Sequence, residues 1–337
     1  MVDFAGWDMP LNYGSQIAEH RIVRSAAGMF DVSHMTIIDI NGAGDRDFLR
    51  RLVANDVAKL TGVGQALYGV LLNADAGIID DLIVYRRESG YRCVVNAATR
   101  DKVLHWFSEH NEEGITLAER DLAMIAVQGP AALERFEEVS VERNVASIAA
   151  FTAHEHGDWM IARTGYTGED GLEIMLPPAD AIQLWADLAA AGVQPAGLAA
   201  RDTLRLEAGL NLYGQDMDES TNPLISNLGW TIGWIDETRS FIGRDALTKI
   251  RAAGVGERLA GLVMMQKGVL RHGQRVITEV GEGTITSGSF SPTLGYSIAL
   301  ARVPRTAKGT CQVDVRGKLK GVRIVRPPFV RHGRSVL

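Results

Sequence analysis

The chain has 337 residues, of which 46% are hydrophobic and 23% are charged, and its formal net charge is −6. This is the composition of an ordinary soluble globular protein of two or three domains. No apolar stretch reaches the roughly 18 residues that cross a membrane, and the first residues lack the pattern of a secretory signal, so we expect neither feature.

Helical and strand patterns are mixed in the first 250 residues. Residues 15–30 have the apolar spacing of a helix, with Gly28 placed to end it. Residues 35–56 predict a strand, a glycine-rich turn and a helix, and residues 65–110 predict three strands followed by a helix. Further strand–helix pairs are expected in residues 122–139 and 171–192.

Beyond Gly254 the pattern changes to short strands divided by Gly, Pro and Ser. This spacing predicts a small all-β barrel or sandwich. We therefore place a domain boundary near residues 253–257, which gives regions 1–254 and 255–337. There is no repeat of fixed period.

The last 37 residues are strongly basic. Residues 301–337 contain ten Lys and Arg and one acidic residue, Asp314. A basic tail on an acidic body favours an anionic partner or ligand, and a solvated basic strand is the alternative. Phe329 is the single aromatic residue of this tail, so nucleic-acid binding is not predicted.

Cysteine and histidine usage argues against several kinds of site. Cys93 and Cys311 are the only cysteines, so we expect no disulfide scaffold and a reducing, cytoplasmic setting. The eight histidines show no metal-binding spacing, and no metal is predicted. We interpret His34, in FDVSHM, as a hydrogen-bonded structural residue rather than a base.

Two glycine-rich segments fail as nucleotide or nucleophile motifs. GAGDRDF lacks the third glycine of a dinucleotide fingerprint. GYTGEDG lacks the Lys of a P-loop and the Ser of a nucleophile elbow.

Two carboxylates, Asp80 and Asp81, begin an otherwise apolar strand, AGIIDDLIVYR. Side chains alternate along a strand, so these two face opposite ways, and at least one is buried if both faces of the sheet are covered. A buried carboxylate has to be paired, so an internal hydrogen-bond network would explain it. The residues alone do not show which of the two has a function.

Other polar side chains also stand in apolar or glycine-rich surroundings, namely Tyr68, Asn96, Tyr166, Glu173 and Arg201. Each is explained singly by internal pairing. Together they would suit a flat heteroaromatic ligand, because a carboxylate accepts two N–H bonds, a tyrosine stacks, and an arginine holds an appended carboxylate.

Several long segments resemble one family. MVDFAGWDMPLNYG, GMFDVSHM, GIIDDLIVY, RTGYTGEDGLEI, GLAARDTLRLEAGLNLYGQDMDE and TSGSFSPTLGYSIALARVP closely resemble aminomethyltransferase, the T-protein of the glycine cleavage system. The resemblance runs from the first residue to nearly the last. The short lead that the family usually carries before MVDF is not seen, which suggests a different start site.

The resemblance implies a fold, a reaction and a site. The fold would be α+β and three-lobed, with two interleaved α+β lobes and a C-terminal β-barrel. The enzyme would move the one-carbon unit from the aminomethyl-lipoyl arm of H-protein to tetrahydrofolate, releasing ammonia and forming 5,10-methylenetetrahydrofolate. Asp81 matches the family's essential aspartate, beside folate N10, and Asp80 would be structural or exposed. The folate-binding positions would be Tyr68, Tyr166, Glu173 and Arg201, with Met35, Asn96 and Arg334 as further pocket residues.

Two alternatives remain on the same scaffold. One is another folate-dependent one-carbon enzyme, such as a sulfonium demethylase or the folate half of a dimethylglycine or sarcosine oxidase, although those oxidases usually attach a flavin domain and no dinucleotide fingerprint is present. The other is a non-enzymatic folate-binding protein, which would carry a cysteine in a KGCY-type loop where this chain has GYTGEDG. We also expect the ten cationic residues after Leu300 to lie in the lobe that borders the folate channel, and Arg316, Lys318, Lys320 and Arg323 among them to help attract an acidic H-protein.

Overall fold

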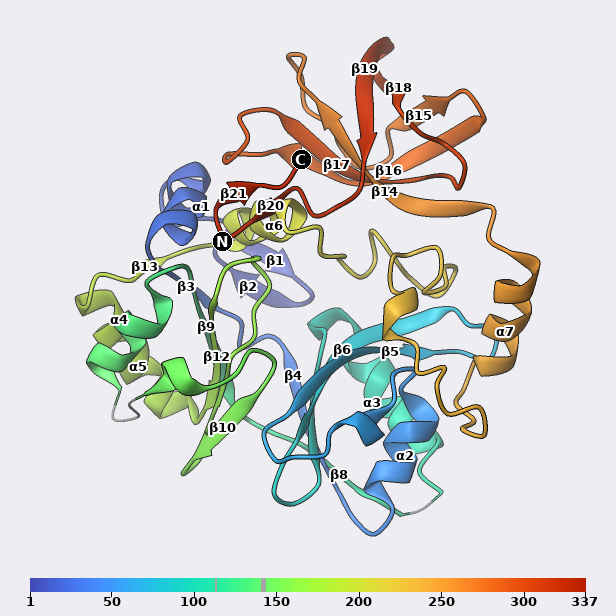
Figure 1. The fold of residues 1–337 in the computed structure, drawn as a ribbon. Coiled ribbons are helices and arrows are strands. Elements are labelled where there is room, and N and C mark those ends of the chain that lie inside the picture. The colour runs from blue at the N-terminus through green and yellow to red at the C-terminus, as the bar shows by residue number, and fades with distance from the viewer. Residues whose placement is uncertain (113, 141–143) are drawn as a thin grey trace.

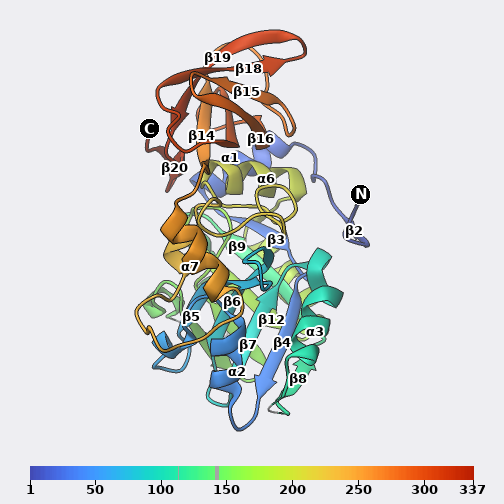
Figure 2. The same ribbon diagram turned by 90° about the vertical axis from the view of Figure 1, so that its right-hand side faces the viewer.

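Two mainly antiparallel sheets and a closed barrel make up the computed structural model, which describes residues 1–112, 114–140 and 144–337. The two sheets stand side by side, and the barrel lies across one end of the pair (Figures 1 and 2). None of the helices in the described ranges combines the length and apolar character needed to cross a bilayer.

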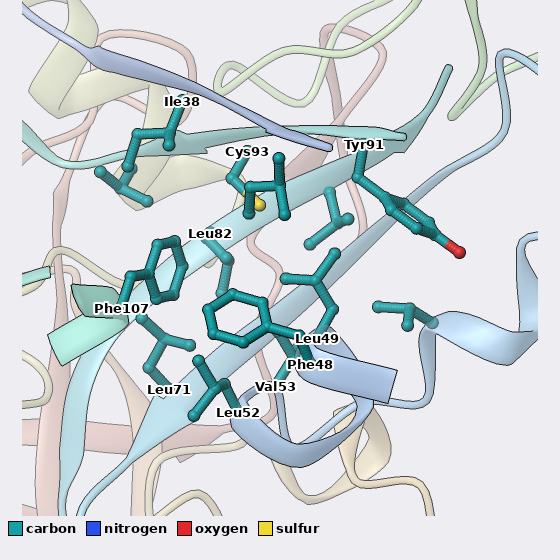
Figure 3. Packing of buried hydrophobic residues seen from close by; sticks show 14 of the residues in the cluster. Ile38, Phe48, Leu49, Leu52, Val53, Leu71, Leu82, Tyr91, Cys93 and Phe107 are labelled. Atoms are coloured by element: carbon teal, nitrogen blue, oxygen red, sulfur yellow. The ribbon is translucent and has the colours of Figure 1, made fainter. Parts of the chain in front are cut away.

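The first sheet has five strands in the order β5-β6-β7-β4-β8. Its strands are β4 (Thr36–Asn41), β5 (Ala66–Leu72), β6 (Ile78–Arg86), β7 (Tyr91–Val95) and β8 (Thr116–Glu119), and its helices are α2 (Asp45–Leu52) and α3 (Arg100–Glu109). Figure 3 shows Phe48 of α2 and Phe107 of α3 meeting beside Leu82 and Cys93 of the sheet. Each of these side chains is buried, and full burial of a large apolar side chain contributes about 1.5–3 kcal/mol.

The second sheet has six strands in the order β10-β11-β12-β9-β3-β13. Its strands are β3 (Gly28–Asp31), β9 (Ala123–Gln128), β10 (Ala153–His156), β11 (Trp159–Ala162), β12 (Gly171–Leu176) and β13 (Gln194–Pro195), and α4 (Ala132–Val139) and α5 (Pro178–Ala190) pack on it. Strand β3 precedes the whole first sheet in sequence but pairs with β9. The two lobes are therefore interleaved, as expected.

The two sheets also share a core. Tyr85 and Val94 of the first sheet pack with Phe30, Met124 and Met175 of the second. Helices α1 (Gln16–Ser25) and α6 (Leu198–Glu207) extend this core toward the barrel. Strand β6, which carries Asp80 and Asp81, is thus covered on both faces.

The end of α1 differs from the expectation. The helix stops at Ser25, where the N–H of Ala26 donates to the carbonyl of Ile22 at 2.7 Å, and Gly28 is already the first residue of β3. A Cβ atom on Gly28 would lie 2.5 Å from Cγ2 of Val23. The glycine is needed for this close packing and does not cap the helix.

The barrel follows α7 (Arg244–Ala253) and closes through the pairing of β14 with β19. Its strands are β14 (Glu257–Met264), β15 (Arg275–Thr278), β16 (Gly281–Phe290), β17 (Ser297–Pro304), β18 (Thr310–Val315) and β19 (Lys318–Val325). Short hairpins stand at the two ends of the chain, β1 (Val2–Phe4) with β2 (Trp7–Met9) and β20 (Val330–Arg331) with β21 (Arg334–Ser335). The predicted all-β C-terminal part is therefore a closed six-stranded barrel.

Helix α6 joins the barrel to the lobes through Glu207, which is fully buried. One carboxylate oxygen of Glu207 lies 3.1 Å from Nε2 of His20 and accepts from Nη2 of Arg24 at 2.9 Å and from the hydroxyl of Thr293 at 2.7 Å. Burial alone would raise the pKa of Glu207, but His20, the charge of Arg24 and a hydrogen bond from Ser291 lower it to about 2. This carboxylate is thus paired with α1 and with the barrel at once.

Candidate active site

A cavity of about 880 Å³ lies where the two sheets, α6 and the barrel meet. Strands β5, β6 and β7 form one wall and residues 163–173 form the other, while residues 208–213 and 326–332 line it toward the barrel. It contains seven of the eight predicted site residues: Met35, Tyr68, Asp81, Asn96, Tyr166, Glu173 and Arg201. A large concave space with a few converging polar groups is typical of a small-molecule site.

Asp81 is half-buried and faces this cavity from β6. Its Oδ2 accepts a hydrogen bond of 2.9 Å from the hydroxyl of Tyr68, and its Oδ1 accepts one of 2.8 Å from the amide of Asn96. Burial raises the pKa of Asp81, while these two bonds and the charge of Arg201 oppose the rise. A carboxylate with a raised pKa at a cavity wall can take a proton from a bound amine.

Asp80 is fully buried and lies opposite Leu71 of β5. Its Oδ2 accepts from the hydroxyl of Thr99 at 2.6 Å, and its Oδ1 accepts from the amide of Asn96 at 2.7 Å. Burial, and then the charge of Asp81, raise its pKa. The expectation left Asp80 as structural or exposed, and the structure decides for a buried, hydrogen-bonded carboxylate.

Glu173, in β12, has one occupied and one open carboxylate oxygen. Oε2 accepts a hydrogen bond of 2.6 Å from the hydroxyl of Thr164. Oε1 accepts none from any residue in the described ranges. Burial raises the pKa of Glu173, so its charged form gains from a donor supplied by a ligand.

Arg201, in α6, lies over the ring of Tyr166, with its guanidinium carbon 4.6 Å from the ring centroid. The hydroxyl of Tyr166 donates to the carbonyl of Asn211, which holds the ring in place. Over residues 1–112, 114–140 and 144–337 the guanidinium of Arg201 forms no hydrogen bond or ion pair. Its donors are therefore available to an anionic or carbonyl group in the cavity.

A second cavity, of about 910 Å³, lies behind Met35, which lines both spaces. Residues 33–37, 97–102 and 119–122 form its walls together with Ala5 and Trp7 of the N-terminal hairpin. Trp7 is half-exposed here. Met35 thus lies between the two cavities.

His34 lines the second cavity and is buried. Its Nδ1 has no hydrogen-bond partner in the described part of the chain, so the interpretation of His34 as hydrogen-bonded is wrong for this atom. The ring is instead packed edge-on against Phe4, with the centroids 5.4 Å apart. Burial, and then the charge of Arg201, lower the pKa of His34 to about 3, so the ring is neutral at pH 7.

Arg334 is the predicted site residue that does not line the cavity. It lies exposed in β21, and its neighbours Arg331 and His332 line the cavity instead. The other basic residues of the tail are divided: Arg326 lines the cavity, whereas Arg316 forms the β18–β19 turn at the end of the barrel away from the lobes (Figures 1 and 2). The part of Arg316 in attracting H-protein stays a prediction.

Trp230 is a cavity residue that the sequence analysis missed. Its side chain is 70% exposed and stacks on Tyr68, with ring centroids 6.1 Å apart and planes inclined by 25°. It lies in a single 3₁₀ turn, Gly229–Thr231, within a long irregular segment, so no periodicity marks it. The one feature of the sequence that could have pointed to Trp230 is an aromatic residue in a segment without helix or strand periodicity.

Comparison with known proteins agrees with this architecture. The GCVT N-terminal domain matches residues 1–236, and the glycine cleavage T-protein C-terminal barrel domain matches residues 257–331. The chain belongs to the aminomethyltransferase family of the glycine cleavage system. Aminomethyltransferases of Chromobacterium violaceum and Alcanivorax borkumensis are 55% and 56% identical to it, each over all of this chain and 94% of the relative.

A solved structure gives the same result for the fold. Aminomethyltransferase T of the glycine cleavage system from Bartonella henselae superposes with a TM-score of 0.93 at 33% identity, over 99% of this chain and 94% of that one. The predicted family, the three-lobed α+β fold and the enzyme class are thus confirmed. These relatives do not favour either alternative on the same scaffold. The roles of individual residues of this chain in binding the ligand stay predictions.

No metal site emerges from the described side chains. Among them, no three His, Cys, Asp or Glu residues are gathered so that they could hold a metal ion. Both cysteines are buried free thiols.

Proposed function

We propose that this aminomethyltransferase transfers the one-carbon unit of aminomethyl-lipoyl H-protein to tetrahydrofolate in the first cavity. The observation that carries the proposal is the cavity itself, in which Asp81, an open oxygen of Glu173 and the open donors of Arg201 face one space. Glu173 would accept N–H groups of the pterin, and Tyr166 would pack on the ligand. Arg201 would donate to a carbonyl or carboxylate of folate.

The reaction balances without any further reactant. The methylene carbon leaves sulfur and nitrogen and becomes bonded to N5 and N10 of folate. Of the two N–H protons that folate gives up, one ends on the lipoyl sulfur and one on the departing ammonia. Asp81 would accept a proton from the attacking amine and stabilise the iminium-like cation formed as ammonia leaves.

The second cavity would give the lipoyl arm of H-protein a separate approach. With folate in the first cavity, the lipoyl arm needs its own path to Asp81, and Met35 is the wall that both cavities share. We therefore assign the second cavity to the arm. Its wall mixes apolar residues such as Ile37 and Leu122 with polar ones, which suits a flexible hydrocarbon chain with an amide.

We also place the enzyme in the cytoplasm, which the free state of both cysteines supports. The test of the function is ammonia release from aminomethylated H-protein, measured with and without tetrahydrofolate. We expect release that depends on folate and is matched by equimolar methylenetetrahydrofolate. Release that is indifferent to folate would refute the proposal, and activity on a methylated sulfonium substrate would favour the demethylase alternative.

A further inference from the structure

One amide bridges the two carboxylates of β6. The last residue pair of the β6–β7 ladder is Leu82 with Val95, so Asn96 stands directly beyond it, beside Asp81. Nδ2 of Asn96 donates to Oδ1 of Asp80 at 2.7 Å and to Oδ1 of Asp81 at 2.8 Å. An asparagine amide has two N–H donors, and both are therefore used.

Asp80 is held from three sides. Besides the Asn96 side chain, its Oδ2 accepts from the hydroxyl of Thr99 at 2.6 Å and from the backbone N–H of Asn96 at 3.2 Å. Asp80 is fully buried, so no solvent competes for these bonds. Because the ionised Asp80 carboxylate offers only acceptors, it fixes which end of the Asn96 amide faces the carboxylates.

We infer that Asp80 is a positioning residue that acts through Asn96 to hold the Asp81 carboxylate in its orientation toward the cavity. The inference rests on the proposed function, since it assigns the reacting group to Asp81. Asp80 itself does not line the cavity, whereas Asn96 and Asp81 do. A misdirected carboxylate loses rate because proton transfer depends on close alignment with the bound amine.

Asp80→Asn tests this link because it replaces the acceptor oxygen that faces Asn96 by a hydrogen-bond donor. The new amide has one oxygen, which the two donors from Thr99 and the Asn96 backbone attract. Its NH₂ group then faces Asn96, whose own amide has to turn its oxygen toward it. The turned amide no longer donates to Asp81, so the change is transmitted without altering the volume of the core.

The experiment combines Asp80→Asn, Asn96→Ala and the double variant in single-turnover transfer from aminomethylated H-protein. We expect Asp80→Asn to lower the transfer rate about tenfold, while the folate Kd stays within about twofold of the wild-type value. Losses of this size are typical of residues that orient a reacting group without touching the substrate. The double variant should be no slower than Asn96→Ala alone. Unchanged rates in Asp80→Asn, or losses that multiply in the double variant, would overturn the inference.

A measurement independent of activity accompanies the kinetics. In protein labelled with ¹⁵N-asparagine, the side-chain amide pair that disappears in Asn96→Ala is that of Asn96, and Asp80→Asn should shift it. An unmoved pair would overturn the inference. Absence of transfer in the wild type would count against the proposed function instead, and the amide pair would still decide whether Asp80 orients Asn96.

Two further variants separate positioning from plain stability. Thr99→Val removes the hydroxyl that donates to Asp80. It replaces Asp80→Asn as the test if Asp80→Asn does not fold. We expect it to slow transfer about threefold. An unchanged rate in Thr99→Val would then contradict the inference.

Asp39→Asn is the matched control, because Asp39 is a buried carboxylate of the same sheet that pairs with Arg92. We expect Asp39→Asn to lower stability and to leave the transfer rate of the folded enzyme unchanged. If it slows transfer as much as Asp80→Asn does, the loss follows from burial in this sheet and the positioning role is refuted.

Discussion

The hydroxyl of Tyr68 donates a 2.9 Å hydrogen bond to Oδ2 of Asp81 across the adjacent strands β5 and β6. This bond favours the ionised form of Asp81, in opposition to burial, which raises its pKa. Tyr68→Phe keeps the ring that stacks on Trp230 and removes the donor. We expect the acidic limb of the pH–rate profile for transfer to move upward by about one to two pH units, because a lost bond to a charged group is worth about 1.5–3 kcal/mol.

The profile of Tyr68→Phe is to be measured at saturating folate, beside the wild type. Folate affinity should change little, since the stacked ring is retained. A profile that does not move would show that the Asp81 carboxylate does not limit the rate at low pH.

Asp81→Asn should nearly abolish transfer, by a factor of about 10²–10⁴, because it removes the base and the charge that stabilises the cation. Folate binding, measured by calorimetry, should persist because the volume is unchanged. Asp80→Asn should be much milder. Equal losses in the two variants would mean that the assignment of Asp81 as the reacting group is mistaken.

Glu173→Gln should weaken folate binding rather than the chemical step. The open Oε1 is the expected acceptor, and an amide can present a donor there to a donor of the pterin. The loss should be about 1–3 kcal/mol in calorimetric titration with a folate analogue. The transfer rate at saturating folate should stay near that of the wild type, and an unchanged affinity would argue against a pterin contact.

Ala98→Trp should obstruct the second cavity, whose wall includes Ala98. We expect a higher KM for aminomethylated H-protein, while the folate Kd stays unchanged because Ala98 does not line the first cavity. Ala98→Ser, which adds little volume, is the control. If the KM for H-protein stays the same, the lipoyl arm takes another path.

His34 should make the folded protein sensitive to mild acid. Its pKa falls from an ordinary 6.5 to about 3 on folding, so above pH 6.5 the ring is neutral in both states and has no effect. As the pH falls below 6.5, the unfolded chain binds a proton that the folded chain refuses, and folding loses stability. Between pH 7 and pH 5 the loss is about 2 kcal/mol.

Urea unfolding of His34→Phe at both pH values measures this contribution. The variant should show a smaller drop in free energy of unfolding than the wild type. His105→Gln is the control, because the His105 side chain is 80% exposed. Equal drops in wild type and His34→Phe would contradict the lowered pKa.

The sequence predicted most elements correctly because their apolar spacing is local. It misassigned Gly28, whose role is set by Val23 in the neighbouring helix, since such a contact leaves no trace in spacing. The Asp80–Asp81 pair was visible as an anomaly in an apolar strand, yet the shared Asn96 amide depends on the register of β6 with β7. Register is a property of the assembled sheet and not of any one strand.

Site residues on regular elements were easier to foresee than those in loops. Glu173 and Arg201 interrupt apolar or small-residue runs, and both reach the cavity. Trp230 lies in an irregular segment, and Arg331 lies in the short hairpin at the end of the chain, so neither is marked by a long periodic pattern. Resemblance to the family pointed to Arg334, but the hairpin geometry brings Arg331 to the cavity in its place.

The joint at Glu207 has a consequence for how the molecule melts. Detaching the barrel would remove the Thr293 hydroxyl from this buried carboxylate, and a hydrogen bond to a charged group is worth about 1.5–3 kcal/mol. The barrel is therefore stabilised by its contact with α1 and α6 for as long as these two helices remain folded. The free energy of the barrel and that of the lobes are thus coupled, so we expect heat to unfold the chain as a single cooperative unit despite its two-part sequence.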